Sequence, residues 1–510
     1  MLWLALHLPL LPLEAFCATL SAQDAARPVA LVADHRVIQV NTAAAERGLR
    51  PGIKRATALV LAAELLIADS QPHHEAREAA ALRAVAHAAL AFTPMVCLHG
   101  AQTVLLDVQS SLRLFGGLAA LLQRLQAALV PLGHRVQVAA APTALGAALL
   151  AQWHPRGLAD LVGGRHATVL PALQALLLQA PVHLLGPGRE HWEALQGMGL
   201  HTLADLQALP RTGLARRFGE NLLDELDRAL GRQPDPRQPL ALPAVFDSQL
   251  ELFARADTTD QVLHGASVLL ARLVAWAQAR HARVAAFTLR MLHERSRQVL
   301  TPATELRIEL AEPALDAAHL QGLLRERLGR LELVAPTLDL QLHCSQLVAG
   351  PMPNGELFPT RSSQAEGLTR LLERLRARLG DEQVLRLEVV ADHRPEHASR
   401  TVPAQGERAS AVSLAPATRA DAALPLHHPA WLLPEPLPLA ERDTLPMLQG
   451  RLLQLVSGPE RIESGWWDGD AVARDYYIAQ AHDGALVWVY RGRLPGQPGE
   501  VTWHLQGLFG

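Results

Sequence analysis

Two glycine-containing turns near the middle of the chain carry the clearest chemical pattern in the sequence. The first, at 186–188, opens a predicted helix, and the second, at 197–199, separates that helix from the next. Glycine lets the backbone approach a phosphate closely, and the N–H groups at a helix N-terminus face the anion. We interpret the pattern as a helix-hairpin-helix that contacts a DNA backbone, against the alternative of an ordinary helix pair with glycine caps. The predicted contact residues are Gly186, Gly188, Arg189, Arg211, Arg216 and Arg217.

A second group of arginines occupies residues 280–297, where Glu294 is the only acidic residue. Arginines on neighbouring strand ends can follow a phosphate backbone without reading its sequence, and the alternative is a solvated sheet face. Lys54 is the only lysine of the chain, so arginine is its default cation and only clusters are informative. The DNA-binding residues predicted in this group are Arg280, Arg283, Arg290, Arg295 and Arg297.

The composition is typical of a globular chain with several domains. Its 510 residues are 49% hydrophobic and 19% charged, which supplies apolar material for several cores. The net charge of −3 gives no global attraction to nucleic acid, so any polyanion site must be local. Cys17, Cys97 and Cys344 are too few and too far apart for a disulfide framework. Without a signal-peptide pattern or an apolar run of membrane-spanning length, we expect a cytoplasmic protein that does not enter a membrane.

The order of the predicted elements indicates an α/β and α+β multidomain protein. In residues 1–165, helices alternate with strands, and residues 241–345 predict the order β-α-β-β-α-β, a split βαβ sandwich. The last sixty residues are aromatic-rich and contain a hairpin turn at Asp483-Gly484, which predicts a β-rich module. The strands predicted in the first unit are 2–8, 29–32, 36–40, 103–108 and 135–140.

The sequence resembles the Y-family translesion DNA polymerases in several stretches of residues 1–345. Residues 47–52 resemble the fingers motif of that family, 105–108 its "YLDV" strand, 140–143 its "GVAP" segment and 198–202 its thumb. Within the family, the runs 111–117, 458–469 and 474–477 are most similar to the ImuB branch, the polymerase-like subunit of a bacterial mutagenesis cassette.

The resemblance implies a right-hand polymerase-like architecture followed by a C-terminal β-rich module. It places palm and fingers in residues 1–165, a helix-hairpin-helix thumb in 166–240 and the little finger in 241–345. The remaining segments are predicted as a linker at 346–362, a helix-strand segment at 363–393, a Pro/Ala-rich tether at 394–440 and an interaction module at 441–510.

The family's chemistry needs carboxylates that hold two Mg²⁺ ions, and the matching positions here carry none. The first-strand position falls on His7, and the expected Asp-Glu pair falls among Gln102, Thr103 and Val104. Neutral histidine is a poor ligand for Mg²⁺, because a hard ion prefers oxygen.

The cationic side chains that hold the triphosphate in the family are also missing. Their positions fall on Thr42, Ala45, Ala144 and Ala148. We therefore expect a non-catalytic homologue with no catalytic residue, no metal site and no cofactor. The alternative is an active Mg²⁺-dependent translesion polymerase in which Glu14, Asp34 and Asp107 form a displaced metal site.

One short motif in the linker predicts a protein partner. Asn354, Leu357 and Phe358 resemble the clamp-binding peptide "Q-x-x-L-F", with Asn in place of Gln. A Leu-Phe pair on an extended segment can fill an apolar pocket, although an incidental apolar pair in a linker is the alternative. The resemblance implies a DNA-binding scaffold in SOS-induced translesion synthesis and mutagenesis. Its implied partners are damaged or primed DNA, the β sliding clamp, a RecA-like (ImuA-type) accessory protein and an error-prone C-family DNA polymerase.

Overall fold

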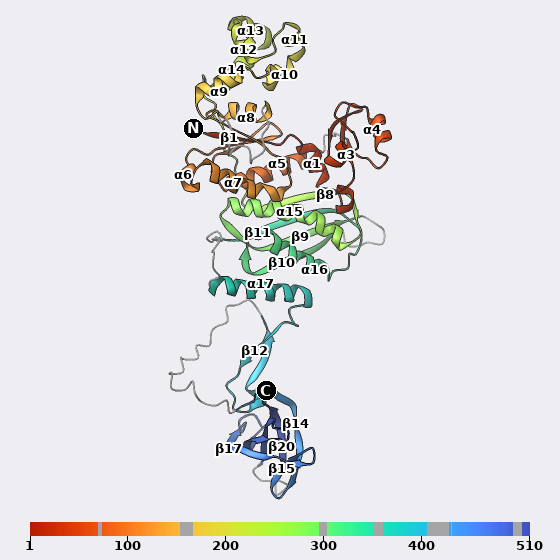
Figure 1. Cartoon of the computed structure of the whole chain (residues 1–510), viewed down its shortest axis with the longest axis vertical. Coiled ribbons are helices and arrows are strands. Elements are labelled where there is room, and N and C mark those ends of the chain that lie inside the picture. Colours follow the sequence, from red (N-terminus) through yellow and green to blue (C-terminus); the bar gives the residue numbers. More distant parts are fainter. Residues whose placement is uncertain are drawn as a thin grey trace. The chain divides into compact units, whose positions relative to one another are not determined.

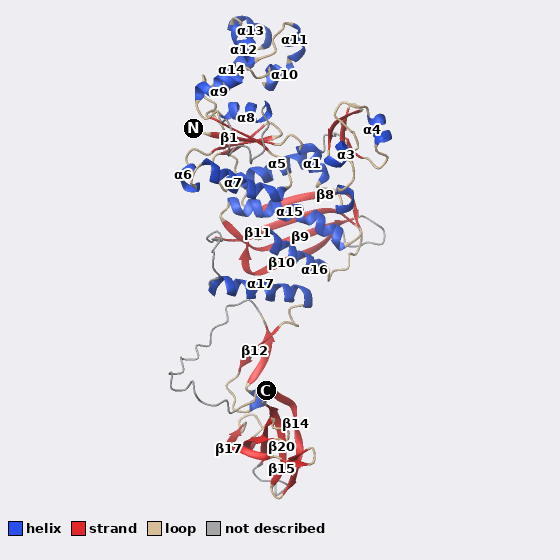
Figure 2. Ribbon diagram, in the orientation of Figure 1, coloured by secondary structure: helices blue, strands red, loops and turns tan. Residues whose placement is uncertain are grey.

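The structure is a computed structural model that describes residues 1–69, 74–153, 167–294, 303–349, 361–404, 428–429, 431–492 and 502–509. Two compact units, Met1–Arg378 and Leu379–Gly510, account for the chain and are described separately. Mixed α/β layers make up the first unit, and the second is built mainly from strands (Figure 2).

The palm is an antiparallel sheet in the order β5-β6-β1-β7, with helices against both faces (Figure 1). Side chains of β1 alternate between two cores: Trp3 and Ala5 pack with α8, whereas Leu4 and Leu6 pack with α5 and α7. A strand buried on both faces must be apolar throughout, which explains the unbroken apolar start of the chain. The bounds are β1 Trp3–His7, β5 Val96–His99, β6 Thr103–Asp107, β7 Gln137–Ala141, α5 His74–Leu90, α6 Leu112–Phe115, α7 Leu118–Leu129, η1 Val130–Leu132 and α8 Ala144–Trp153.

The fingers form a separate sheet in the order β3-β2-β4, in which β2 pairs with β3 antiparallel and with β4 parallel. Helix α4 ends at Leu61, because Ala62 adopts an extended conformation, and β4 begins at Leu66. The bounds are α1 Leu11–Cys17, α2 Ala22–Ala25, β2 Val29–Ala33, β3 Arg36–Val40, α3 Thr42–Glu46, α4 Arg55–Leu61 and β4 Leu66–Asp69.

The thumb is a set of short helices whose leucines join the palm core that contains α8. A capping box at Thr202 and Asp205 starts α12, and Gly199, at φ 76°, makes the turn before it. The bounds are α9 Leu170–Leu177, η3 Val182–Leu184, α10 Gly186–Glu190, α11 Trp192–Gly197, α12 Leu203–Ala208, α13 Arg211–Phe218 and α14 Glu220–Ala229.

The little finger has the predicted β-α-β-β-α-β order and an antiparallel sheet in the order β10-β9-β11-β8. Its long helix α15 packs on the sheet and also against α5, so that Ala275 joins the palm core. Among the described helices, only α15 has the length and hydropathy of a membrane span, and most of it is buried in this fold. The bounds are β8 Phe246–Ala256, α15 Thr259–Ala279, β9 Ala282–His293, β10 Ala303–Ala314, α16 Ala317–Leu328, β11 Thr337–Ala349 and, after the linker, α17 Arg361–Leu379.

The second unit contains a two-stranded sheet, β12-β13, and a seven-stranded sheet in the order β16-β15-β14-β20-β19-β18-β17. The prediction of a tether over 394–440 is wrong where β13 and β14 lie. The prolines of β14 are typical of a linker, but here they occupy a strand whose pairing register shifts. The predicted hairpin around Gly484 joins β18 to β19. The bounds are β12 Leu385–Val389, η4 Pro395–His397, β13 Ser399–Pro403, β14 Trp431–Arg442, β15 Leu445–Leu448, β16 Arg451–Leu452, β17 Gln454–Ser464, β18 Val472–Gln480, β19 Leu486–Gly492 and β20 Trp503–Leu508.

Candidate nucleic-acid interface

The positions that match the polymerase metal ligands meet at one edge of the palm sheet. His7 ends β1 directly opposite Thr103, which begins β6. The Nδ1 atom of His7 lies 3.0 Å from the Thr103 hydroxyl oxygen, and the Leu8 N–H donates to the Gln102 carbonyl at 2.8 Å. The fold thus brings His7, Gln102 and Thr103 together, and none of them carries a carboxylate.

The electrostatics of this edge disfavour a positive charge. Burial lowers the pKa of His7, and the nearby Arg189 guanidinium of the thumb lowers it further. A neutral imidazole bonded to a hydroxyl offers no anionic oxygen to a hard divalent ion.

The carboxylates of the alternative metal site have other structural roles. Asp107 lies opposite Trp3, at the far end of β6 from Thr103, and accepts from the Gln109 N–H at 3.1 Å. Glu14 accepts from the Arg135 N–H at 3.1 Å. Asp34 sits in the turn between β2 and β3 at φ 47°. Within the residues that the structure describes, no three His, Cys, Asp or Glu side chains gather as a metal site.

The four positions that match the triphosphate-binding residues of the family carry small, uncharged side chains. Thr42 begins α3, and Ala45 lies in the same short helix. Ala144 and Ala148 are buried in α8. No cation therefore projects from these four positions.

The two glycines at the start of the thumb hairpin have different structural roles. A Cβ at Gly188 would lie 2.1 Å from the Val182 carbonyl oxygen, so only glycine fits there. The Gly186 N–H donates to the Glu225 carboxylate at 2.9 Å, at the N-terminus of α10. The Glu225 carboxylate therefore accepts a hydrogen bond from the N–H group that we expected to face a phosphate. Phosphate contact at this hairpin stays a prediction.

The thumb arginines fall into two kinds. Arg211 makes a bidentate ion pair with the buried Asp227 and therefore has a structural role. Arg216 and Arg217 are exposed in the last turn of α13, and neither has a carboxylate partner among the described residues. Arg189 is also exposed, and its Nε donates weakly to the His183 carbonyl at 3.4 Å. These three guanidinium groups remain accessible to a phosphate backbone.

One arginine of the little-finger group, Arg290, lies on a sheet face that also carries several carboxylates. Cross-strand partners in an antiparallel sheet lie on the same face. The pairing of β10, β9, β11 and β8 defines three neighbouring rows of such partners on one face. Arg290 lies in the middle row, with its Nε 3.5 Å from the Glu305 carboxylate. The charged side chains on these rows are Arg290, Arg307, Asp247, Glu251, Glu305 and Asp339.

The other members of this arginine group lie elsewhere. Arg280 follows directly after α15, where it donates to the Pro243 carbonyl at 2.6 Å and lies over the Trp276 ring. Arg283 is half-buried at the start of β9. Arg295 and Arg297 lie outside the described residues, as do Asn354, Leu357 and Phe358 of the clamp motif.

One exposed aromatic surface, the turn that carries Trp466 and Trp467, was not singled out from the sequence. Their side chains are 74% and 57% exposed, and the rings meet edge to face at 4.7 Å. Arg394, which is buried, fixes this turn by hydrogen bonds to the Asp468 carboxylate and the Asp470 carbonyl. The sequence shows the aromatic cluster but not which members are exposed, because Tyr476 and Trp488 stack in the core.

The solved structures that this chain resembles are Y-family DNA polymerases. A Y-family chimera of Dbh and Dpo4 is 15% identical, with a TM-score of 0.36 over 69% of this chain and 100% of that chain. DinB from Sulfolobus solfataricus is 15% identical, with a TM-score of 0.35 over 68% of this chain and 99% of that chain.

Among curated proteins, the chain is similar to Protein ImuB of Caulobacter vibrioides, in each of two strains. It is 29% identical to each over 484 residues, which cover 91% of this chain and 100% of the relative. No family model matches the chain. The match along nearly the whole sequence confirms the resemblance predicted from the motifs.

Proposed function

We propose that this protein is a catalytically inactive polymerase homologue that acts as a DNA-binding scaffold in SOS-induced translesion synthesis. The observation that carries the proposal is the palm edge, where a hydrogen-bonded His7–Thr103 pair replaces the oxygen ligands that nucleotidyl transfer needs. The similarity to Protein ImuB along the chain supports a role of the same kind. Such a role requires no metal cofactor of its own and belongs in the cytoplasm, where primed DNA lies.

DNA contact is proposed to be strongest at the thumb. Arg189, Arg216 and Arg217 are exposed without carboxylate partners among the described residues, and guanidinium groups bind phosphates in a charge-assisted, sequence-independent way. The arginines of the little finger would add a weaker contribution, because neighbouring carboxylates offset their charge.

Partner binding is proposed to use the linker and the second unit. Leu357 and Phe358 would bind the β sliding clamp, and the second unit would hold a RecA-like accessory protein and an error-prone C-family polymerase. The exposed Trp466 and Trp467 support a docking role, because tryptophan is enriched among the residues that dominate interface energies. A turn already fixed by Arg394 also loses little conformational entropy on binding.

Primer extension tests the proposed lack of catalysis. Purified protein should add no nucleotide to a primed template in Mg²⁺ or Mn²⁺, with an active Y-family polymerase as the positive control. Asp107→Ala is the diagnostic variant, and Glu46→Ala, on the exposed side of α3, is its matched control. Template-dependent extension that Asp107→Ala abolishes and Glu46→Ala leaves intact would establish the active-polymerase alternative instead.

Two binding measurements test the scaffold role. A synthetic 350–362 peptide should bind purified clamp saturably, Asn354→Gln should tighten it, and Leu357→Ala with Phe358→Ala should abolish it. Changing Trp466 and Trp467 to Ala should weaken binding to a purified C-family polymerase by about 30-fold or more, as expected for central anchors. Trp431→Ala is the matched control, because Trp431 is 71% exposed on β14, away from that turn. Equal losses in the control, or no saturable peptide binding, would contradict these docking sites.

A further inference from the structure

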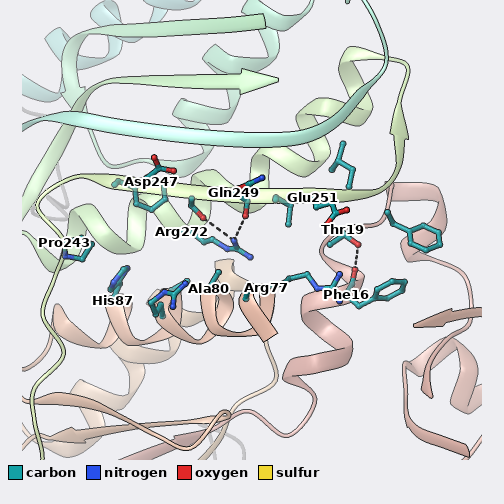
Figure 3. Close-up of a pocket in the computed structure, with 18 of the residues that line it drawn as sticks. Phe16, Thr19, Arg77, Ala80, His87, Pro243, Asp247, Gln249, Glu251 and Arg272 are labelled. Carbon is teal, nitrogen blue, oxygen red and sulfur yellow. Dashed lines mark hydrogen bonds between the residues drawn. The ribbon is translucent and has the colours of Figure 1, made fainter. Parts of the chain in front are cut away.

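A cavity of about 920 Å³ lies where the palm meets the little finger within the first unit. Helices α1 and α5 line it on the palm side, and β8 and α15 line it on the other (Figure 3). Phe16 and Thr19 lie at one end and His87 at the other, with Arg272 between them. The volume falls in the range of small-molecule sites, about 300–1,000 Å³.

Arg272 projects from α15 into this cavity as a buried cation without a counterion. Its exposed fraction is 5%, and no carboxylate of a described residue is among the groups that shift its pKa. Its two hydrogen bonds, to the Ser248 hydroxyl at 3.3 Å and the Gln249 carbonyl at 3.5 Å, are long. A guanidinium has five N–H donors, so most of the hydrogen-bonding capacity of Arg272 is unused. Burial and, to a smaller extent, the nearby Arg83 together lower the pKa of Arg272 to about 10.

The α5 side adds a second cation and a neutral histidine near Arg272. Arg83 is exposed at the cavity and lies close enough to Arg272 and His87 to lower the pKa of both. Burial is the larger cause for His87, whose pKa falls to about 4, so the ring is neutral at pH 7 and can donate or accept one hydrogen bond. Two guanidinium groups that face one cavity repel each other unless an anion lies between them.

The acidic residues at the cavity do not compensate this pair. Asp247 accepts from the Gln341 amide at 3.0 Å, on β11. Glu251 and Glu78 act on Arg77 instead, and Arg77 lies over the Phe16 ring at 5.5 Å. The charge balance is therefore local: Arg77 has acidic neighbours, whereas the Arg83–Arg272 pair lacks them.

We propose that this cavity binds a phosphate-bearing small molecule, with its phosphates between Arg83 and Arg272. The Ser248 hydroxyl of β8 and the His87 ring of α5 line the cavity from its two sides and would complete the hydrogen bonds to the phosphate oxygens. Phe16 and the other apolar residues at the opposite end would accommodate a nucleoside or leave room for a longer phosphate chain. Because Arg83 belongs to the palm and Arg272 to the little finger, the bound anion would also tie the two together.

Isothermal titration of the full-length protein tests this site, with pyrophosphate, ATP and adenosine as probes at constant ionic strength and without divalent metal. We expect saturable binding of pyrophosphate, ATP or both at one per chain, and none of adenosine. Arg83→Gln changes an exposed side chain, so the fold should survive, and it should weaken binding about tenfold, the loss of one charge-assisted contact. Arg113→Gln, an exposed arginine on α6, is the matched control and should bind as the wild type does.

The probes also distinguish the source of the phosphate. Equal affinities for pyrophosphate and ATP would assign the site to phosphate groups alone, whereas tighter ATP binding would assign it to a nucleoside polyphosphate. Arg272→Gln should abolish binding of either. No saturable binding at millimolar concentrations would overturn the proposal, and so would binding that is indifferent to Arg83→Gln, which would place the anion elsewhere, such as at the His7 edge of the palm.

Discussion

The thumb and the little finger both carry arginine groups, and they differ in what surrounds those arginines. On α13 of the thumb, Arg216 and Arg217 have no ion-pair partner among the described residues. On the little-finger sheet, Arg290 faces Glu305, and the rows around it carry more carboxylates than guanidinium groups. In the sequence, the little-finger group looks the more basic of the two, because its carboxylates come from other strands.

This difference shows that local arginine density predicts a phosphate-binding surface only when the neighbouring elements are known. Cross-strand neighbours in a sheet come from distant parts of the chain, so Glu305 and Asp247 reach Arg290 and its neighbours only in the fold. In a helix, by contrast, the neighbours three and four positions away are visible in the sequence.

Charge reversal in the thumb should have the largest effect on DNA binding. Arg216→Glu with Arg217→Glu should weaken binding to primed DNA roughly 100-fold and reduce the salt slope by about two, because two phosphate contacts are lost. Fluorescence anisotropy across a salt series measures both quantities. The matched control, Arg290→Glu with Arg307→Glu, should cost less than about threefold in affinity. Equal losses in the two double variants would remove the distinction between the regions.

The ion pairs of the two regions should also differ in what they contribute to stability. Asp227→Asn leaves Arg211 without its buried partner and should destabilise the α13–α14 helices by about 2 kcal/mol. Hydrogen exchange of these helices should then be roughly 30-fold faster. Hydrogen exchange followed by mass spectrometry resolves this region from the rest of the chain. The exposed pair offers the control: Glu305→Gln should change exchange of β9 and β10 by less than about 0.5 kcal/mol.

The smallest effect should come from removing a carboxylate that competes with DNA. Glu305→Gln frees Arg290 and should tighten DNA binding by about threefold or less, with the gain lost at high salt. Competition binding of variant and wild type against one labelled DNA measures so small a change. Weaker binding in this variant would mean that Glu305 orients Arg290 for contact rather than neutralising it.

Much of the fold was predictable from periodicity and turn chemistry. The predicted strands at 2–8 and 103–108, and the β-α-β-β-α-β order of the little finger, correspond to observed elements. The strands β4 and β5 were missed because each has four residues, which is too short for a clear alternation. The strand β14 was missed because Pro434, Pro436 and Pro438 are typical of a linker, and only tertiary pairing accommodates them.

The candidate sites were predictable to a different degree. The motif spacing assigned His7 and Thr103 to two strands, and the register of β1 with β6 places them opposite each other. The roles of Glu225 at the thumb hairpin and Asp227 beside Arg211 were not visible, since each acts on residues 16 or 39 positions away. The Arg83–Arg272 pair lies even farther apart in the sequence, and only the packing of α15 on α5 brings it together.

The packing of α15 against α5 also has a mechanical consequence. Because Ala275 belongs to the same apolar core as Leu82 and Val85, the little finger cannot pivot on this face without opening that core. This resistance to pivoting makes the palm and the little finger a stiff frame. A force applied to the chain would therefore deform the connections outside the frame before it deformed the frame itself.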